Sequence, residues 1–444
     1  VGISLQHPIY DEEDNELLEG GVLLTAKVLE KIKAGDRKWV MLHSVDGAMV
    51  IGLDEESSKA EDASEQTSVD AATKPKRISR TIPNLSAVNA RVEALSETAS
   101  YSVKNQGPPL KDAVVSKRSS PYDEKQMLEL KERYANATKV IDKLIDDVLA
   151  GKADDSQTLD KVAGSHVREL TNEDPDLALY TASNLSLSPE MAERSIRLSL
   201  LSIAMAIELG FDEANVREIG LCAMVCDWGK YFLPERLQNE SAPVLSRDFN
   251  VFQAHPLYTA ELLSSMDGIS REVRFAATQV FENADGSGYP KGVDEKKIHP
   301  YASLLQVANI YLTLTSRVRG REAYTPYDVM VYLLHQIKAG RVSQPAVRAL
   351  LNSVSLFPIG SVVELEDGTI AKVIRRNDTQ YTAPVVQKVG ADQQLRFDQA
   401  EQDVIDLAAA KLSVKSAIAS LERNEQRIEK EQMDKILWSA MDES

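Results

Sequence analysis

Residue types that could do chemistry are concentrated in three short stretches of the second half of the chain. Residues 227–230 read Asp-Trp-Gly-Lys, His255 is followed by proline, and residues 285–290 read Asp-Gly-Ser-Gly-Tyr-Pro. Carboxylate and imidazole groups bind borderline and hard cations, whereas a lysine or a row of loop amides can bind an anion. The remaining histidines show no metal-ligand spacing: His7, His43, His166, His299 and His335.

The loop at 285–290 ends a helical segment and cannot continue it. Its two glycines supply backbone conformations with positive φ, and Pro290 fixes its own φ and favours an extended residue before it. An apolar-rich segment, residues 273–281, leads into the loop. On local chemistry alone, this stretch predicts a surface loop between two helices, because most Gly-Pro clusters mark turns.

The order of these stretches resembles that of the HD-GYP family, whose active members are metal-dependent phosphodiesterases that open cyclic di-GMP. The motif at 285–290 is similar to the signature loop of the family, and residues 227–230, His255 and the segment 307–311 (Val-Ala-Asn-Ile-Tyr) lie in the family's order. The resemblance covers about residues 185–345 and is more specific than a single short motif. It implies a mainly α fold with an HD-GYP-like helical core.

The resemblance also places the metal ligands of the family on this sequence. In the family, histidines and aspartates from several helices hold two or three ions, iron or manganese, which activate a hydroxide for attack on phosphorus. Asp227 and His255 keep the expected residue type. The other ligand positions carry different residues: Arg194, Cys226, Val280, Phe281, Asn309 and Leu312. We therefore expect a vestigial metal site that holds no ion, no cofactor and no catalytic residue.

Cys226 leaves one alternative open at this site. Together with Asp227 and His255 it could form a Cys-Asp-His set for a soft ion. A buried, unreactive thiol is the favoured interpretation, because free cysteines are usually buried and inert. Cys222 lies four residues earlier in an apolar helical pattern, which indicates two reduced thiols and no disulfide framework.

Several other positions of the family are retained, and the resemblance implies that they recognise an anionic or nucleotide-like ligand. These candidate binding residues are Lys230, Asp285, Gly286, Gly288, Tyr289, Pro290 and Arg321. A lysine charge, an arginine fork and loop amides suit phosphate oxygens. A structural interpretation is slightly favoured: Lys230 could cap a helix, Arg321 could pair with Glu322 or Asp328, and the glycines could shape the turn.

The composition restricts the classes of function. The chain has 444 residues, 43% of them hydrophobic, and a formal net charge of −17. This charge argues against nucleic-acid polymers and anionic membranes as partners, although a local basic pocket could still bind a small anion. The longest apolar run, about residues 198–209, is too short to span a bilayer, and the start shows no signal peptide. We expect a cytoplasmic protein without a membrane span.

The chain is expected to contain five segments. They are a small α+β accessory unit (1–52), an acidic flexible linker (53–121), an HD-GYP-like helical domain (122–355), a small β unit (356–400) and an amphipathic C-terminal helix (401–444). The linker follows from the Asp-, Glu- and Ser-rich composition of residues 54–83.

The last two segments rest on hydrophobic periodicity. The β unit follows from alternating apolar residues on both sides of the turn at 367–368. The C-terminal helix, a packing or dimerising element, follows from apolar residues that recur every seven positions: Leu407, Val414, Leu421 and Ile428.

These observations predict a catalytically inactive HD-GYP-like signalling protein. It would act as a sensor of cyclic di-GMP or another nucleotide, or as a scaffold for protein partners or a homodimer. The alternative is an active metal-dependent cyclic di-GMP phosphodiesterase with a reduced metal site. The small number of retained metal ligands favours the inactive protein.

Overall fold

The computed structural model divides the chain into two compact units, Val1–Lys76 and Arg77–Ser444, called here the N-terminal unit and the main unit. Among the described residues, no helix is long and apolar enough to cross a membrane. The structure describes short strands within residues 1–41 and the following ranges: 85–97, 102–115, 120–152, 156–186, 190–238, 248–318, 321–377, 380–398 and 400–429.

The described part of the N-terminal unit consists of short antiparallel strands. β2 (Ile9–Asp11) pairs with β3 (Glu16–Leu18) and with β5 (Val40–Met41), and β1 (Ile3–Ser4) pairs with β4 (Leu23–Leu24). These strands fall within the predicted α+β accessory unit. The helical part of this predicted unit lies outside the described residues.

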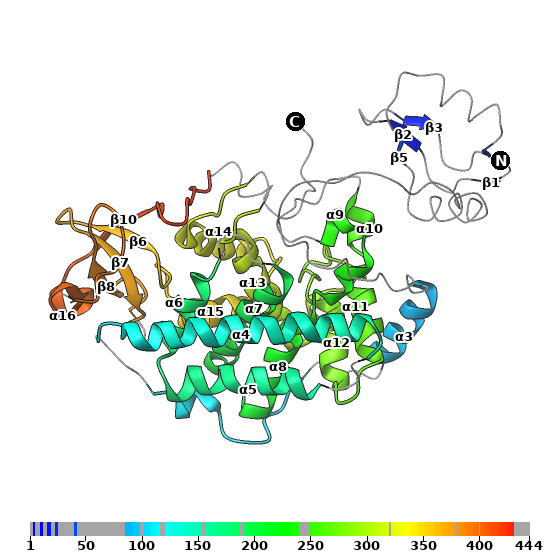
Figure 1. Ribbon diagram of the computed structural model, residues 1–444, viewed down its shortest axis with the longest axis horizontal. Helices are drawn as coiled ribbons and strands as arrows, with labels where there is room; N and C mark the ends of the chain where they lie inside the picture. The colour runs from blue at the N-terminus through cyan, green and yellow to red at the C-terminus, as the bar shows by residue number, and fades with distance from the viewer. Residues whose placement is uncertain are drawn as a thin grey trace, which may run out of the picture. The chain divides into compact units, whose positions relative to one another are not determined.

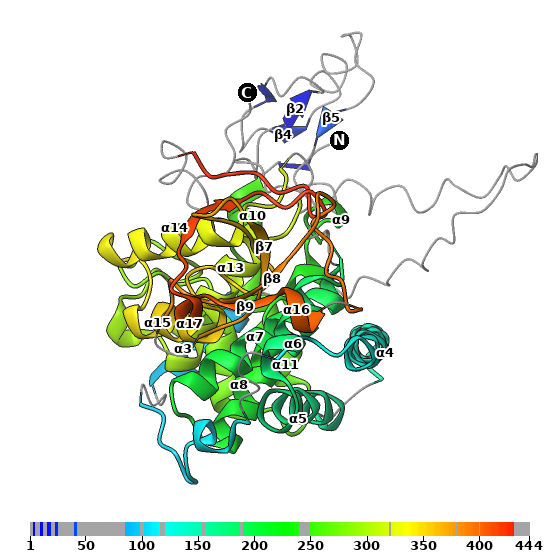
Figure 2. The same cartoon turned by 90° about the vertical axis from the view of Figure 1, so that its left-hand side faces the viewer.

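The main unit is largely helical, with α7 at its centre (Figures 1 and 2). Almost every side chain of α7 is buried, and this helix packs against α4, α5, α8, α13 and α15. The larger helices are α3 (Leu85–Glu97), α4 (Glu124–Leu149), α5 (Gln157–Asn172), α6 (Pro175–Ser183), α7 (Met191–Glu208), α8 (Glu213–Val225), α11 (His255–Ser264), α12 (Arg271–Gln279), α13 (Pro300–Leu314), α14 (Pro326–Lys338) and α15 (Gln344–Val354). Shorter elements are η1 (Leu110–Ala113), η2 (Trp228–Phe232), α9 (Glu235–Gln238), α10 (Phe249–Phe252), η4 (Glu295–Lys297), α16 (Ala400–Asp403) and α17 (Leu407–Ala410).

Side-chain caps fix where several of these helices begin. The Asp212 carboxylate caps α8 by accepting a hydrogen bond from Asn215 N at 3.1 Å. Ser270 caps α12 in the same way through Val273 N. α7 begins at Met191.

A five-stranded antiparallel sheet follows the helices and lies at one end of the main unit (Figure 1). The strand order is β10-β6-β7-β8-β9. The predicted hairpin is confirmed: β6 and β7 pair across the turn at Gly368, whose φ of +86° suits glycine. The strands are β6 (Val362–Leu365), β7 (Ile370–Arg375), β8 (Val385–Lys388), β9 (Val404–Asp406) and β10 (Val414–Ile418).

The predicted C-terminal helix is wrong for residues 401–429. Leu407 begins the four-residue helix α17, Val414 lies in β10, and Leu421 is 70% exposed in a turn. β9 pairs with β8 and β10 pairs with β6, so ladder hydrogen bonds and burial under the sheet outweigh the seven-residue period. Residues 430–444 lie outside the description.

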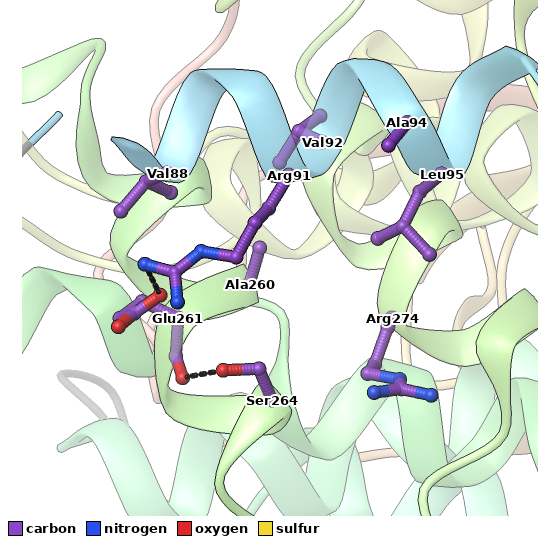
Figure 3. Close-up of a pocket in the computed structure, with 9 residues that line it drawn as sticks. All are labelled: Val88, Arg91, Val92, Ala94, Leu95, Ala260, Glu261, Ser264 and Arg274. Carbon is purple, nitrogen blue, oxygen red and sulfur yellow. Dashed lines mark hydrogen bonds and ion pairs between the residues drawn. The ribbon is translucent and has the colours of Figure 1, made fainter. Parts of the chain in front are cut away.

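The boundary predicted for the linker is also wrong, because residues 85–97 and 102–115 belong to the main unit. α3 buries Val88 and Val92 against Leu257 and Ala260 of α11, and a cavity of about 290 Å³ lies between α3, α11 and α12 (Figure 3). Few large apolar residues are enough for this docking, so composition alone did not reveal it.

The sheet and the helices share a buried, charged junction. Arg375 of β7 forms two hydrogen bonds of 2.8 Å with the Asp174 carboxylate and lies over the Tyr122 ring. The adjacent Arg376 pairs with Asp176 at 3.2 Å and with Glu208 at 2.9 Å. The predicted boundary at residue 356 therefore separates two parts of one compact unit.

Candidate functional site

Asp227 lies at the centre of a buried polar cluster, where α8 passes into η2. Its Oδ1 is 2.9 Å from Lys230 Nζ, and its Oδ2 is 3.5 Å from Arg194 Nε of α7. His255, the first residue of α11, places Nε2 3.7 Å from Asp227 Oδ1. All four residues are buried. The fold thus brings together three predicted site residues and Arg194. Arg194 stands where the family resemblance implies a histidine.

Opposite charges determine the ionisation of this cluster. Burial alone would raise the pKa of Asp227, but Lys230 and then Arg194 outweigh burial and hold the pKa below its usual range. Asp227 is therefore a carboxylate that is paired with two cations. One negative charge faces two positive charges at this position.

His255 is a neutral imidazole in the same cluster. Burial, reinforced by Lys230, lowers the pKa of His255 to about 3. Nδ1 lies 2.8 Å from the Phe252 carbonyl, so this nitrogen carries the proton and donates it. Nε2 consequently carries the lone pair and lies near Asp227 Oδ1 without a hydrogen bond between them. A metal-binding histidine uses the same tautomer.

Arg194 links the cluster to α13. Its guanidinium donates hydrogen bonds to Asn309 Oδ1 and, at 2.8 Å, to Thr313 Oγ1. Asn309 and Arg194 both occupy positions predicted to carry metal ligands in the family. In this chain they bind each other directly.

Aromatic rings enclose the cluster on the loop side. Phe281 packs edge-on against His255, with centroids 4.5 Å apart, and stacks on Tyr289 at 5.2 Å. The Lys230 ammonium lies 5.4 Å from the Phe252 ring and 5.9 Å from the Phe281 ring. These cation–π contacts stabilise the buried lysine charge and exclude water from it.

The loop at 285–290 is held by its own backbone and by Glu282. Gly286 has a φ of +79°, and a Cβ on Gly288 would lie 2.2 Å from Asn283 N. The buried Glu282 carboxylate accepts hydrogen bonds from Lys291 N at 2.7 Å and from Val293 N at 3.1 Å. The two glycines therefore have clear structural roles.

Asp285 of the loop also makes internal contacts. Asp285 accepts a hydrogen bond from Ser287 N at 3.0 Å and lies 3.6 Å from Arg341 Nε. Pro290 follows Tyr289 through a cis peptide bond.

Arg321 caps the C-terminal end of α13. Its guanidinium donates to four carbonyl oxygens, those of Thr313, Leu314, Ser316 and Glu322, at 2.8–3.2 Å. Neither carboxylate suggested as its partner has this role, since Glu322 pairs with Arg317 and Asp328 pairs with Arg427.

Comparisons with known proteins identify the domain that contains this cluster. The family model of the HD domain matches residues 181–341. The chain is 25% identical over 232 residues to the cyclic di-GMP phosphodiesterase PA4108 of Pseudomonas aeruginosa, covering 52% of this chain and 54% of that protein. It is 32% identical over 157 residues to the cyclic di-GMP phosphodiesterase response regulator RpfG of Xanthomonas campestris, covering 35% and 41%. This region is an HD domain of the HD-GYP family.

The resemblance to solved proteins covers more of the chain at lower identity. Bd1817, described as an HDG"Y"P protein from Bdellovibrio bacteriovorus, is 15% identical, with a TM-score of 0.41 over 78% of this chain and 94% of that chain. The chain spans about half the length of the curated relatives named above, 54% and 41% of them.

The residues of this HD-GYP domain do not fit a metal cluster. Among the residues that the structure describes, no group of three or more His, Cys, Asp and Glu side chains is placed to hold an ion. Two family ligands are retained, Asp227 and His255. Both oxygens of Asp227 already face cations, so only His255 Nε2 keeps a lone pair that is not engaged by a cation. Cys226 Sγ lies 3.5 Å from the Ala223 carbonyl, and burial raises the pKa of this thiol.

Sequence reasoning missed three residues of the HD-GYP centre. Phe252 and Thr313 contact Lys230 and Arg194, and Glu282 fixes the loop. Glu282 stands three residues before the glycine-rich loop, where its carboxylate can meet loop amides. Phe252 and Thr313 carry no comparable signal, because their roles arise only when α10 and α13 pack around Asp227.

Proposed function

We propose that this HD-GYP domain does not hydrolyse cyclic dinucleotides and acts in signalling as a protein-interaction scaffold. The observation that supports this function is the closed cluster of Arg194, Asp227 and Lys230, which is covered by Phe281. The family's reaction uses a metal-bound hydroxide, whose pKa is lowered from about 15.7 towards neutrality. Two cations at the retained carboxylate repel a further cation.

Displacement of these cations by a metal ion is unfavourable. Arg194 would have to give up Asp227, Asn309 and Thr313, and Lys230 would have to leave its aromatic surroundings. Separating a buried ion pair leaves uncompensated charge, typically at a cost of about 3–5 kcal/mol. The centre is therefore stable without a metal.

The alternative function is an active phosphodiesterase with a reduced metal site, which the names of the curated relatives favour. The two functions are separated by assaying cyclic di-GMP hydrolysis with Mn²⁺ or Fe²⁺, together with elemental analysis of the purified chain. We expect no bound transition metal and equal background rates for the wild type and Asp227→Ala. Metal-dependent turnover that disappears in Asp227→Ala would establish the enzyme instead.

A nucleotide sensor is the second non-catalytic function, and it assigns ligand contacts to Lys230, Arg321 and the loop 285–290. Both cations make internal contacts in this structure, with Asp227 and with the end of α13 respectively. A sensor would have to exchange these contacts for phosphate oxygens. This requirement favours the scaffold.

Calorimetric titration of the full chain with cyclic di-GMP at fixed salt tests this choice. The scaffold function predicts no saturable binding. Saturable binding that weakens about tenfold in Lys230→Ala or Arg321→Ala would support the sensor, since a charge-assisted hydrogen bond is worth about 1.5–3 kcal/mol. Arg396→Ala, which removes an exposed arginine of the β unit, is the matched control.

A further inference from the structure

The cavity between α3, α11 and α12 lies away from the HD-GYP centre and has charged side chains at both of its ends (Figure 3). Its volume is about 290 Å³, close to the lower limit of small-molecule sites. The apolar walls come from α3 and α11: Val88, Val92, Leu95 and Ala260. None of the residues that line the cavity belongs to the cluster around Asp227.

The charges at one end of the cavity are already balanced. Arg91 of α3 pairs with Glu261 of α11 at 2.7 Å. Figure 3 shows this pair on one side of the cavity and Arg274 of α12 on the other. The hydroxyl of Ser264, between them, donates to the Glu261 carbonyl oxygen at 2.7 Å. This end therefore presents a neutral ion pair to a ligand.

Arg274 differs from Arg91 because its charge has no partner. Within the described part of the chain, its guanidinium forms no hydrogen bond and no ion pair, and its Nε is shielded from solvent. The end of α3 does not need this cation, because Arg271, one turn earlier on α12, donates to the Leu95 carbonyl at 3.0 Å. Buried polar atoms are nearly always paired, so Arg274 Nε indicates a missing acceptor.

The surrounding charges restrict the chemistry of that acceptor. A guanidinium binds a carboxylate through two parallel N–H···O hydrogen bonds. A phosphate dianion would need a second cation, but Arg91 is engaged by Glu261. One negative charge therefore balances Arg274, and the apolar walls suit a hydrocarbon body.

We propose that the cavity between α3, α11 and α12 binds a small monocarboxylate with an apolar body, whose carboxylate pairs with Arg274. Mostly apolar pockets with a few polar groups that fix the orientation are typical ligand sites. The hydrocarbon part lies against Val88, Val92 and Ala260, so the ligand contacts α3 and α11 at once. The site adds a small-molecule ligand to the scaffold and is independent of the HD-GYP centre.

2-Naphthoate and its amide, naphthamide, are matched probes, because they share the ring system and differ in the charge of the polar group. Each is titrated into the full chain by ligand-observed NMR at fixed salt. We expect naphthoate to bind the wild type about tenfold tighter than naphthamide, since hydrogen bonds between two charged groups are stronger than those of a neutral acceptor.

Two charge variants test the polar end of the cavity. Arg274→Gln removes the cation and should make the two probes bind equally. The midpoint of its urea unfolding should stay close to that of the wild type, because Arg274 has no ion-pair partner within the described residues. Glu261→Gln releases Arg91 and should strengthen naphthoate binding by up to about fivefold, in line with the strength of an exposed ion pair. A gain in affinity cannot come from unfolding.

Two tryptophan variants of α3 locate the binding. Ala94 is exposed and lines the cavity, so Ala94→Trp should block it without disturbing the core. Ala90 is exposed one turn earlier and does not line the cavity, so Ala90→Trp is the control and should bind naphthoate normally. In the wild type, naphthoate should also slow amide hydrogen exchange in α3, because a bound ligand stabilises the docked helix.

The outcomes decide the proposal in either direction. Tighter binding of naphthoate that is lost in Arg274→Gln and Ala94→Trp and kept in Ala90→Trp supports the site. Equal affinity of the two probes for the wild type, tighter binding of naphthoate that survives Arg274→Gln, or no saturable binding of naphthoate would each overturn it.

Discussion

Two buried ion clusters of the main unit differ in their geometry. At the sheet junction, Arg375 and Asp174 form two hydrogen bonds of 2.8 Å, and the Tyr122 ring covers the guanidinium. At the HD-GYP centre, Asp227 instead makes one single contact with each of two cations, 2.9 Å to Lys230 Nζ and 3.5 Å to Arg194 Nε. The neutral His255 lies 3.7 Å from the same carboxylate.

The difference indicates two origins for buried charge. The junction shows the short bidentate geometry of a purely structural pair. The centre holds a carboxylate and an imidazole in metal-ligand positions, with cations and a phenylalanine added around them. We therefore interpret the junction as a structural ion pair and the centre as an ion cluster at positions where the family resemblance implies metal ligands.

Asp174→Ala should have the largest effect on stability. The substitution leaves Arg375 buried without its carboxylate and also removes the cap that Asp174 provides to Leu177 N at the start of α6. A buried charge that loses its partner costs about 3–5 kcal/mol, so the midpoint of urea unfolding should fall strongly.

The matched control for this variant is Asp392→Ala, which breaks an exposed pair with Arg396. Surface pairs contribute about 0–1 kcal/mol, so this variant should unfold nearly as the wild type does. Similar losses in both variants would contradict the structural role of the junction.

Asp227→Ala should be the next most destabilising change. It leaves Lys230 and Arg194 facing each other in a buried site without their shared carboxylate. We expect a loss of about 3 kcal/mol in the free energy of unfolding, at the lower end for broken buried pairs because Arg194 keeps Asn309 and Thr313. Unchanged stability, measured by urea unfolding without added metal, would mean that the ion cluster does not form.

Asp176, beside the junction, gives a smaller effect that depends on pH. Burial raises the pKa of Asp176 to about 6, although Arg376 and Arg375 oppose the rise. A raised folded-state pKa means that the folded protein binds the proton more tightly, so this contribution is complete below the unfolded pKa of about 3.9 and is lost as the pH rises to about 6.

Asp176→Asn should remove this pH dependence while keeping the shape of the side chain. Between pH 4 and pH 6 the wild type should lose about 2 kcal/mol of stability relative to the variant, as measured by urea unfolding at several pH values. Parallel pH profiles for the two proteins would show that Asp176 is ionised throughout.

Contacts between residues that are close in the sequence determine some of the local structure. The cap at Asp212 and the turn at Gly368 both depend on such contacts, and the sequence predicted the turn. Leu421 shows the limit of periodicity: it fits the heptad pattern but lies exposed in a turn, because β10 pairs with the edge of a sheet built from distant residues. α3 was missed for a related reason, since its docking on α11 depends on tertiary contacts.

The candidate site was predictable in its residues but not in its contacts. The spacing of the motifs located Asp227, Lys230 and His255, which the fold brings together. The pairing of Lys230 with Asp227 depends on how η2 turns at the end of α8. The hydrogen bonds of Arg321 to backbone carbonyls depend on the path of the loop that follows α13. Backbone acceptors of this kind leave no trace in the sequence.

Lys230→Met should have the smallest effect on the free energy of unfolding. It also tests most directly whether the centre differs from the simple ion pair of the junction. The substitution removes one of two cations, so Asp227 keeps Arg194 and remains paired. A methionine of similar length can pack between the Phe252 and Phe281 rings, where sulfur–aromatic contacts replace the cation–π contacts. We therefore expect a loss of about 1 kcal/mol or less in urea unfolding, because replacing a buried ion by a well-packed apolar group is often nearly neutral. A loss as large as that of Asp227→Ala would show that Lys230 alone balances the carboxylate, and the centre would then be a simple ion pair like the junction.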